Sequence, residues 1–199
     1  IALAGAFSLG TVALTRGETV NALWIVIAAV CVYLIAYRYY SRFIANKVDL
    51  VLAIATPAAQ SIAAKTDKIP ILGTAITDYV SAKLVNSDEA PGGNVTGTTD
   101  MNPIREQIDL LYKLAPDAKT VGVLYTSNED NSILQAKLAK EAIEKLGLTY
   151  MELTVSNSNE VQQATQSIVD QCDAIYIPTD NIFASAMPVV HGVTSVSKT

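Results

Sequence analysis

The residues best suited to chemistry are polar groups that follow three predicted strands. They lie in residues 55–57, 125–128 and 178–181. In open α/β sheets, ligands bind at the carboxyl ends of the strands. A helix that starts there presents free N–H groups, which suit a carboxylate, and an acid such as Asp180 at another strand end suits an ammonium group. The pattern therefore indicates a site for the zwitterionic head of an amino acid.

Each of these groups also has a plain structural interpretation. Thr56 and Asn181 are typical helix N-caps, and Asp180 could equally cap the helix that follows it. Glu129 and Asp130 are adjacent in a predicted loop. We expect both of them to be solvated, so they do not form a pair of catalytic carboxylates.

The composition argues against catalysis, metal binding and nucleic-acid binding. Two cysteines, Cys31 and Cys172, and one histidine, His191 in a tail without a pattern, are too few for a zinc site. No phosphate-binding loop follows a strand, and the glycine-rich residues 91–97 do not open a helix. A net charge of −5 disfavours nucleic acid as a partner. We expect no catalytic residue, metal or cofactor, with a flavodoxin-like or sugar-processing enzyme as the lesser alternative.

The elements that position these groups alternate between strand and helix after Val48. Short apolar runs predict strands, and longer amphipathic stretches predict helices. Thr56 is expected to cap the first helix, with Pro57 at its first position, and Gly147 to close a later one. This order implies a parallel sheet with right-handed crossovers. The predicted strands are 48–55, 69–74, 120–125, 148–155 and 174–177, and the predicted helices are 58–65, 103–114, 132–146, 160–169 and one from 181 onward.

The first 47 residues have a different chemistry. Residues 22–37 form an unbroken apolar run, extended by flanking apolar residues to about the 20 that span a bilayer. Arg38, Arg42 and Lys47 follow this run, so its carboxyl end should face the cytoplasm. We predict a transmembrane segment. A secretory signal peptide and a buried helix of a soluble protein are the alternatives.

This segment also has a sequence similar to that of a known membrane-protein family, at residues 8–10, 13–26, 33–40 and 43–45. They resemble the N-terminus of the carbon starvation family of bacterial inner-membrane peptide transporters. The resemblance implies the end of a first span, a short periplasmic turn and a second span. Because the resemblance covers about 47 residues of a transporter with many spans, we do not expect transport by this chain alone.

The second part of the chain carries another resemblance. Its amino-acid sequence resembles that of ABC-transporter substrate-binding proteins with the type I periplasmic-binding fold, in the branch of tryptophan and tyrosine binders. The resemblance implies two α/β lobes with parallel sheets and helices on both faces, joined by a hinge near residues 94–97. It rests on residues 51–60, 69–78, 91–100, 121–125, 146–154, 158–164 and 173–181.

The resemblance implies a ligand site in the cleft between the lobes. The ligand would be an amino acid, tryptophan or tyrosine, and the partner an ABC permease. The first lobe would contribute Thr56, Thr77 and Asp78, and the second lobe Ser127, Asn128, Asn131, Ser132, Asp180 and Asn181. Tyr79, Tyr125 and Phe183 are candidates for stacking on an aromatic ligand, and each could equally belong to the core.

The predicted organisation is a hydrophobic segment at 1–47, a partial first lobe at 48–96 and a second lobe at 97–199. Both lobes are expected to be incomplete, with about two strands in the first and no family match in residues 191–199. The basic flank would place the second part in the cytoplasm, whereas the resemblance places it outside the membrane, in the cell envelope. The alternative function is therefore a fused, truncated or composite membrane-protein fragment without activity of its own.

Overall fold

The computed structural model describes residues 47–197 together with Thr11, Thr15 and Val30. The chain divides into two compact units, Ile1–Asp49 and Leu50–Thr199. The predicted transmembrane segment, residues 1–47, lies almost entirely outside the described residues. Within the part that is described, no helix combines the length and the apolar character needed to cross a membrane.

The second unit begins with a three-stranded parallel sheet. Its strands β1 (Val51–Ile54), β2 (Ile71–Ile76) and β3 (Val95–Thr99) lie side by side in that order. Helix α3 (Thr56–Ala63) joins β1 to β2. The expectation of about two strands in this lobe is wrong, because Val95–Thr99 follows the turn at 91–94 and pairs with β2. This third strand crosses the predicted lobe boundary between residues 96 and 97.

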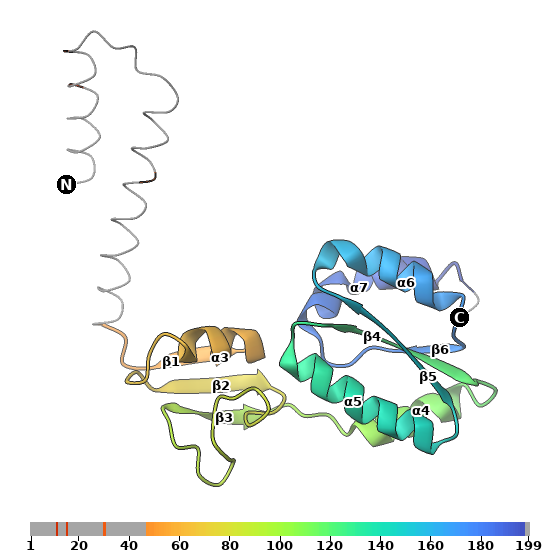
Figure 1. Cartoon of the computed structure of the whole chain (residues 1–199), viewed down its shortest axis with the longest axis horizontal. Helices are drawn as coiled ribbons and strands as arrows, with labels where there is room; N and C mark the ends of the chain where they lie inside the picture. Colours follow the sequence, from red (N-terminus) through yellow and green to blue (C-terminus); the bar gives the residue numbers. More distant parts are fainter. Residues whose placement is uncertain (1–10, 12–14, 16–29, 31–46, 198–199) are drawn as a thin grey trace. The chain divides into compact units, whose positions relative to one another are not determined.

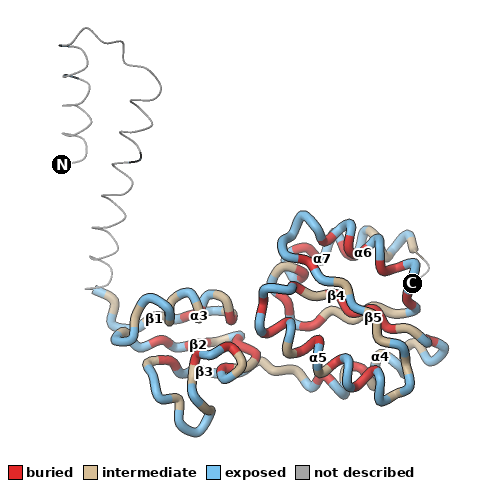
Figure 2. Tube along the Cα trace, in the orientation of Figure 1, coloured by how far each residue is buried: buried red, intermediate tan, exposed pale blue. Residues whose placement is uncertain are grey.

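The two faces of this first sheet differ in burial. Strands in sequential order place their right-handed crossovers on one face, and here Ala59 of α3 packs with Ala53, Ile71 and Val95. Residues on the other face are exposed, with 58% of Leu52 and 61% of Ile54 accessible to solvent. Figure 2 marks the exposed positions along the chain in pale blue. A parallel sheet is usually covered on both faces, so this sheet has an unusually apolar open face.

A second parallel sheet follows, in the order β5-β4-β6. The strands are β4 (Thr120–Thr126), β5 (Thr149–Val155) and β6 (Ala174–Tyr176). Helices α4 (Ile104–Leu114) and α5 (Asp130–Lys145) cover one face, and α6 (Val161–Val169) and α7 (Asn181–Thr194) cover the other (Figure 1). A single 3-10 turn, η1 (Ser158–Glu160), precedes α6. The predicted α/β fold with parallel sheets is confirmed.

The core of the second sheet lies on both sides of β4. Val121 and Val123 point to the cluster that contains Ile108 and Ile143 from α4 and α5. Leu124 points to the opposite cluster, which is completed by α6 and α7. This alternation follows from the pleat of a strand that is buried on both faces. The central strand is thereby fixed from both sides.

Two predictions of element boundaries were wrong. Thr56 is the first residue of α3 and not its cap, because the cap position is taken by Ala55 at φ +75°. Helix α5 starts at Asp130, earlier than the predicted 132, because the Glu129 carbonyl accepts hydrogen bonds from the N–H groups of Ser132 and Ile133. His191, which was expected in a tail without a pattern, lies within α7, and this helix continues to Thr194.

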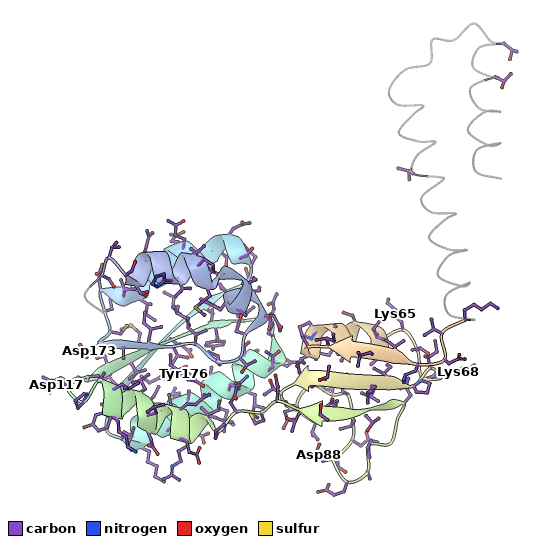
Figure 3. The ribbon with its side chains drawn as sticks, turned by 180° about the vertical axis from the view of Figure 1, so that it is seen from behind. Lys65, Lys68, Asp88, Asp117, Asp173 and Tyr176 are labelled. Carbon is purple, nitrogen blue, oxygen red and sulfur yellow. The ribbon has the colours of Figure 1, made fainter. Side chains whose placement is uncertain are left out.

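Asp173 ties the amino-terminal ends of β4 and β6 together. Its Oδ2 accepts hydrogen bonds from the backbone N–H groups of Lys119 at 2.8 Å and Thr120 at 2.9 Å. These donors hold the pKa of Asp173 below its usual range. Figure 3 shows Asp173 and Asp117 at this end of the sheet.

Asp173 should make the stability of the protein depend on acid pH. A carboxylate whose pKa is lower in the folded state stabilises the fold above the unfolded value of about 3.9, and this contribution is lost as the pH falls through the folded pKa. Wild type should therefore be more stable than Asp173→Asn at neutral pH, and the difference should shrink on acidification. Urea denaturation at several pH values measures this, and Asp117→Asn, which removes an exposed acid at the same end, should show no such pattern.

Gly97 of β3 is packed too tightly for a side chain. A Cβ at this position would overlap the carbonyl oxygen of Gly73 and Oη of Tyr79. Gly93, in the preceding turn, faces open space. Gly97→Ala should lower the free energy of unfolding by about 1–3 kcal/mol through overpacking, whereas Gly93→Ala should change it by less than about 0.5 kcal/mol. Equal thermal melting of the two variants would show that β3 is not held against β2.

Candidate functional site

A buried polar cluster lies where β4 and β6 end. The two strands are parallel neighbours, so their carboxyl ends meet at one edge of the sheet. The residues that follow them come together although about 50 positions separate them in the chain. The buried members are Thr126, Glu129, Asn131, Ser132, Gln135 and Asp180.

Asp180 is satisfied by the fold itself. Its Oδ2 accepts a hydrogen bond from the Thr126 N–H at 2.7 Å. Its Oδ1 accepts from the Thr126 hydroxyl at 2.8 Å and from the Phe183 N–H at 2.9 Å. The last of these bonds caps α7. The structure thus shows the capping role that the sequence left open, and this role belongs to Asp180 and not to Asn181.

Glu129 is a cluster member that the sequence analysis missed. Only 6% of its surface is exposed, so the prediction that Glu129 is solvated is wrong, whereas Asp130 is exposed as expected. The Glu129 Oε2 accepts hydrogen bonds from Nδ2 of Asn181 at 2.7 Å and from the Asn181 N–H at 3.2 Å. Its place directly before a predicted helix, after a strand end, was the signal that could have identified it.

Asn131 lies beside Glu129 in the first turn of α5. Its Nδ2 donates to Oε2 of Glu129 at 3.3 Å, to Oγ of Ser132 at 3.3 Å and to the carbonyl of Thr179 at 3.0 Å. Three acceptors around one nitrogen fix the orientation of the amide, because a flipped amide would place its oxygen against them. The Oδ1 atom is buried and has no hydrogen-bond partner.

Two glutamines connect this cluster to the first sheet, and neither was a predicted site residue. Gln135, fully buried on α5, donates to the Thr77 hydroxyl at 3.4 Å and to the Thr179 carbonyl at 3.3 Å. Gln60 of α3 donates to Oδ2 of Asp130 at 2.7 Å. The residues after β2 and the residues after β4 are therefore in direct contact.

The side chains of the predicted first-lobe residues make fewer hydrogen bonds than those of Asn131 and Asp180. Thr56 is buried at the start of α3, a helix whose first turn has no side-chain cap. Thr77 is buried and contacts Gln135, as described above. Asp78 accepts a hydrogen bond from the Ser81 N–H at 2.6 Å, so its carboxylate stabilises the turn after β2. Ala55 at φ +75° marks local backbone strain next to Thr56.

The other predicted residues of the second lobe lie at the edge of the cluster. Ser127 and Asn128 are exposed. The Ser127 hydroxyl donates to the Val155 carbonyl at 3.2 Å, which ties this loop to β5. Ser132 is buried against Asn131, and Asn181 is held by Glu129. The structure thus gathers Asn131, Ser132, Asp180 and Asn181, with Ser127 and Asn128 outside.

The aromatic candidates pack mainly within the protein. Phe183 is fully buried in the core beside α6. Tyr79 belongs to the core of the first sheet, and burial together with Asp100 raises the pKa of its hydroxyl. Tyr125 is half-buried and donates to Oε2 of Glu152 at 3.2 Å. The core interpretation therefore holds for Phe183 and Tyr79.

Cys172 and His191, the groups suited to nucleophilic or metal chemistry, differ in their surroundings. Cys172 is buried, its Sγ donates to the Ile168 carbonyl at 3.2 Å, and burial raises the pKa of the thiol. His191 is exposed on α7. Among the residues that the structure describes, no three His, Cys, Asp or Glu side chains could share a metal ion.

Two surface cavities lie away from the cluster. One of about 550 Å³ runs along α6 and α7 beside Gln166 and Val193. Another of about 380 Å³ lies between α4 and α5 beside Arg105 and Glu141. Neither is lined by a predicted site residue. The candidate site remains the polar cluster at the strand ends.

Comparison with known proteins identifies a family that matches the part of the chain containing both sheets. A family model described as ABC transporter substrate binding protein matches residues 33–199. The tyrosine-binding protein of Clostridioides difficile (strain R20291) is 43% identical over 158 residues, which cover 79% of this chain and 46% of that protein. The match through residue 199 shows that the expected lack of a match in residues 191–199 is wrong.

Solved structures give the same result. The ABC domain in complex with L-Trp from Streptococcus pneumonia is 43% identical, with a TM-score of 0.75 over 77% of this chain and 52% of that chain. A conserved domain protein from Vibrio cholerae is 38% identical, with a TM-score of 0.75 over 81% and 55%. The chain spans about half the length of these relatives.

A different relative matches only a short stretch. The peptide transporter CstA of Escherichia coli (strain K12) is 60% identical over 48 residues, which are 24% of this chain and 7% of that transporter. The resemblance to the carbon starvation family is confirmed over this short length.

Removing the Asp180 carboxylate should weaken the fold around the cluster. Asp180→Ala leaves the buried Thr126 N–H without a partner and removes the cap of α7, so the free energy of unfolding should fall by at least about 2 kcal/mol. Urea denaturation followed by circular dichroism measures the change. Asp170→Ala, at an exposed acid after α6, is the matched control and should change it by less than about 0.5 kcal/mol. Equal stability of the two variants would contradict a structural role for Asp180.

Proposed function

Because the chain belongs to the family of ABC transporter substrate binding proteins, we propose that it binds an amino acid at the carboxyl ends of its two parallel sheets. Proteins of this family bind a solute and are not enzymes. The single observation that carries the proposal is the buried polar cluster after β4 and β6, which Gln135 connects to Thr77 after β2. A ligand at these strand ends would contact both sheets.

Each end of an amino acid has a matching group in this arrangement. Helix α3 begins at Thr56 without a side-chain cap, so its N-terminus can receive a carboxylate through backbone N–H groups and the helix dipole. The two buried carboxylates at this edge, Glu129 and Asp180, are the candidates for receiving an ammonium group. The nine residues carried over from the family remain the proposed lining: Thr56, Thr77, Asp78, Ser127, Asn128, Asn131, Ser132, Asp180 and Asn181.

The relatives support an aromatic ligand. One is a tyrosine-binding protein, and one structure is a complex with L-Trp. We therefore propose tryptophan or tyrosine as the ligand and an ABC permease as the protein partner. The binding unit would act on the extracytoplasmic side of a bacterial membrane. Attachment there by residues 1–47 requires the orientation opposite to the one that Arg38, Arg42 and Lys47 indicate.

A second candidate is a chain whose lobes bind nothing by themselves. The observation that favours it is the open face of the first sheet, where Leu52, Ile54 and Leu72 are 58%, 61% and 40% exposed. Apolar surface of this kind favours association with further structure. If the first lobe needs such cover before it can hold Thr56 and Thr77 in place, the free chain would not bind ligand.

Thermal melting of the purified chain distinguishes the two candidates. L-tryptophan, L-tyrosine and L-phenylalanine are tested, with L-valine as the branched-chain control. A ligand that binds only the folded state at a hundred times its Kd adds about 2.7 kcal/mol, which for a chain of this size is a shift of roughly 5–10 °C. A shift with one aromatic amino acid and none with valine is the expected result. No shift with any of them would favour the second candidate.

A further inference from the structure

We propose that Glu129 and Asn131, and not Asp180, receive the ammonium group of the ligand. The inference rests on the proposed amino-acid binding and assigns one end of the ligand to particular atoms. It starts from a comparison of two buried carboxylates that lie at the same edge of the sheet. Their exposed fractions are similar, 6% for Glu129 and 3% for Asp180, but their hydrogen-bond partners differ.

Both oxygens of Asp180 are used by the fold. Both of its oxygens accept hydrogen bonds from Thr126, and Oδ1 accepts a further one from the N–H of Phe183. All three bonds are 2.7–2.9 Å long. They join the end of β4 to the start of α7, so Asp180 is used to hold the two segments together.

Glu129 is left with unused capacity. Its hydrogen-bond partners are neutral donors, from Asn131 and Asn181, and all of them reach Oε2. In the described part of the chain, Oε1 accepts no hydrogen bond and no lysine or arginine forms an ion pair with this carboxylate. A buried carboxylate is costly unless it is paired. A cation that reaches Oε1 would therefore compensate the charge of Glu129.

Asn131 supplies an independent observation beside it. The residue is 4% exposed, and its Oδ1 is enclosed without a donor. Its Nδ2 is held by Glu129, Ser132 and Thr179, so the amide cannot turn to satisfy Oδ1 internally. A buried acceptor without a donor is rare in folded proteins and indicates a missing partner.

The two unmatched groups fit one kind of ligand. A primary ammonium group carries three N–H donors and no acceptor. It can donate to the Glu129 carboxylate and to Oδ1 of Asn131 at the same time, because these two side chains are already in contact. A carboxylate placed at this point of the site would be repelled by Glu129. The pair therefore selects a ligand with a free amine over its deaminated analogue.

The binding test uses a ligand pair that differs only in this amine. Affinities of the full chain for L-tryptophan and for indole-3-propionate are measured by isothermal titration calorimetry. Glu129→Gln should weaken L-tryptophan binding about tenfold to a hundredfold, as expected for a lost bond to a charged group. The affinity for indole-3-propionate should change by less than about threefold. Glu141→Gln, at an exposed position of α5, is the control and should leave both affinities unchanged.

A second measurement needs no ligand. Because Glu129 is buried without a cation, Glu129→Gln should not lower the melting temperature of the free chain. It should raise the melting temperature if the buried charge destabilises the fold. If Glu129→Gln destabilises the free chain as strongly as Asp180→Ala, Glu129 supports the fold and the inference is overturned. An equal loss of affinity for both ligands, or no loss, would overturn it as well.

The binding measurement and the melting measurement together separate this inference from the proposed function. If wild type binds none of the amino acids, the proposed function fails, and the melting comparison alone then decides whether Glu129 supports the fold. If wild type binds L-tryptophan and Glu129→Gln binds it equally well, the proposed function stands and the assignment of Glu129 fails.

Discussion

The arrangement of the site depends on two carboxylates that hold the short strand β6 against β4. β6 has only three residues, Ala174–Tyr176, so its own ladder provides few hydrogen bonds. Asp173, just before it, binds the backbone at the start of β4, and Asp180, just after it, binds the backbone at the end of β4. With both ends fixed, residues 127–132 and 178–181 must meet at one edge of the sheet. Charge-assisted hydrogen bonds of this kind are stronger than neutral ones.

The two sheets provide unequal support for a ligand. The second sheet is covered by two helices on each face, and β4 is buried from both sides. The first sheet has its crossovers on one face and exposes Leu52 and Ile54 on the other. Residues contributed by the second sheet are therefore held by a complete core, whereas Thr56 and Thr77 depend on a thinner one. Two hydrogen bonds then become important for the site, Gln60–Asp130 and Gln135–Thr77. They hold the residues after β1 and β2 against those contributed by the second sheet.

Much of the second sheet could be predicted from the sequence, because residues 120–125, 148–155 and 174–177 are apolar runs bounded by turn residues. Strand β3 could not, since Val-Thr-Gly-Thr-Thr has one buried residue, Val95, and owes its structure to pairing with β2. The start of α3 was also misplaced. Its boundary depends on the strained conformation of Ala55, which alanine rarely adopts and no local pattern indicates.

The candidate site shows the same limit at the level of single side chains. The sequence shows acids after β4 and β6, which is the reason to expect an ammonium site. Local patterns alone predict that Asp180 is a site residue or a helix cap, and that Glu129 is a solvated loop residue. Which acid is saturated depends on the register of β6 along β4, since that register brings the Thr126 donors to Asp180. Once these donors are used, Glu129 is the carboxylate with free capacity at this edge, with an unpaired Asn131 oxygen beside it. Asp180, which a family comparison or a motif would select first, is thus used by the fold, and the neighbouring Glu129 is the acid that we propose for binding.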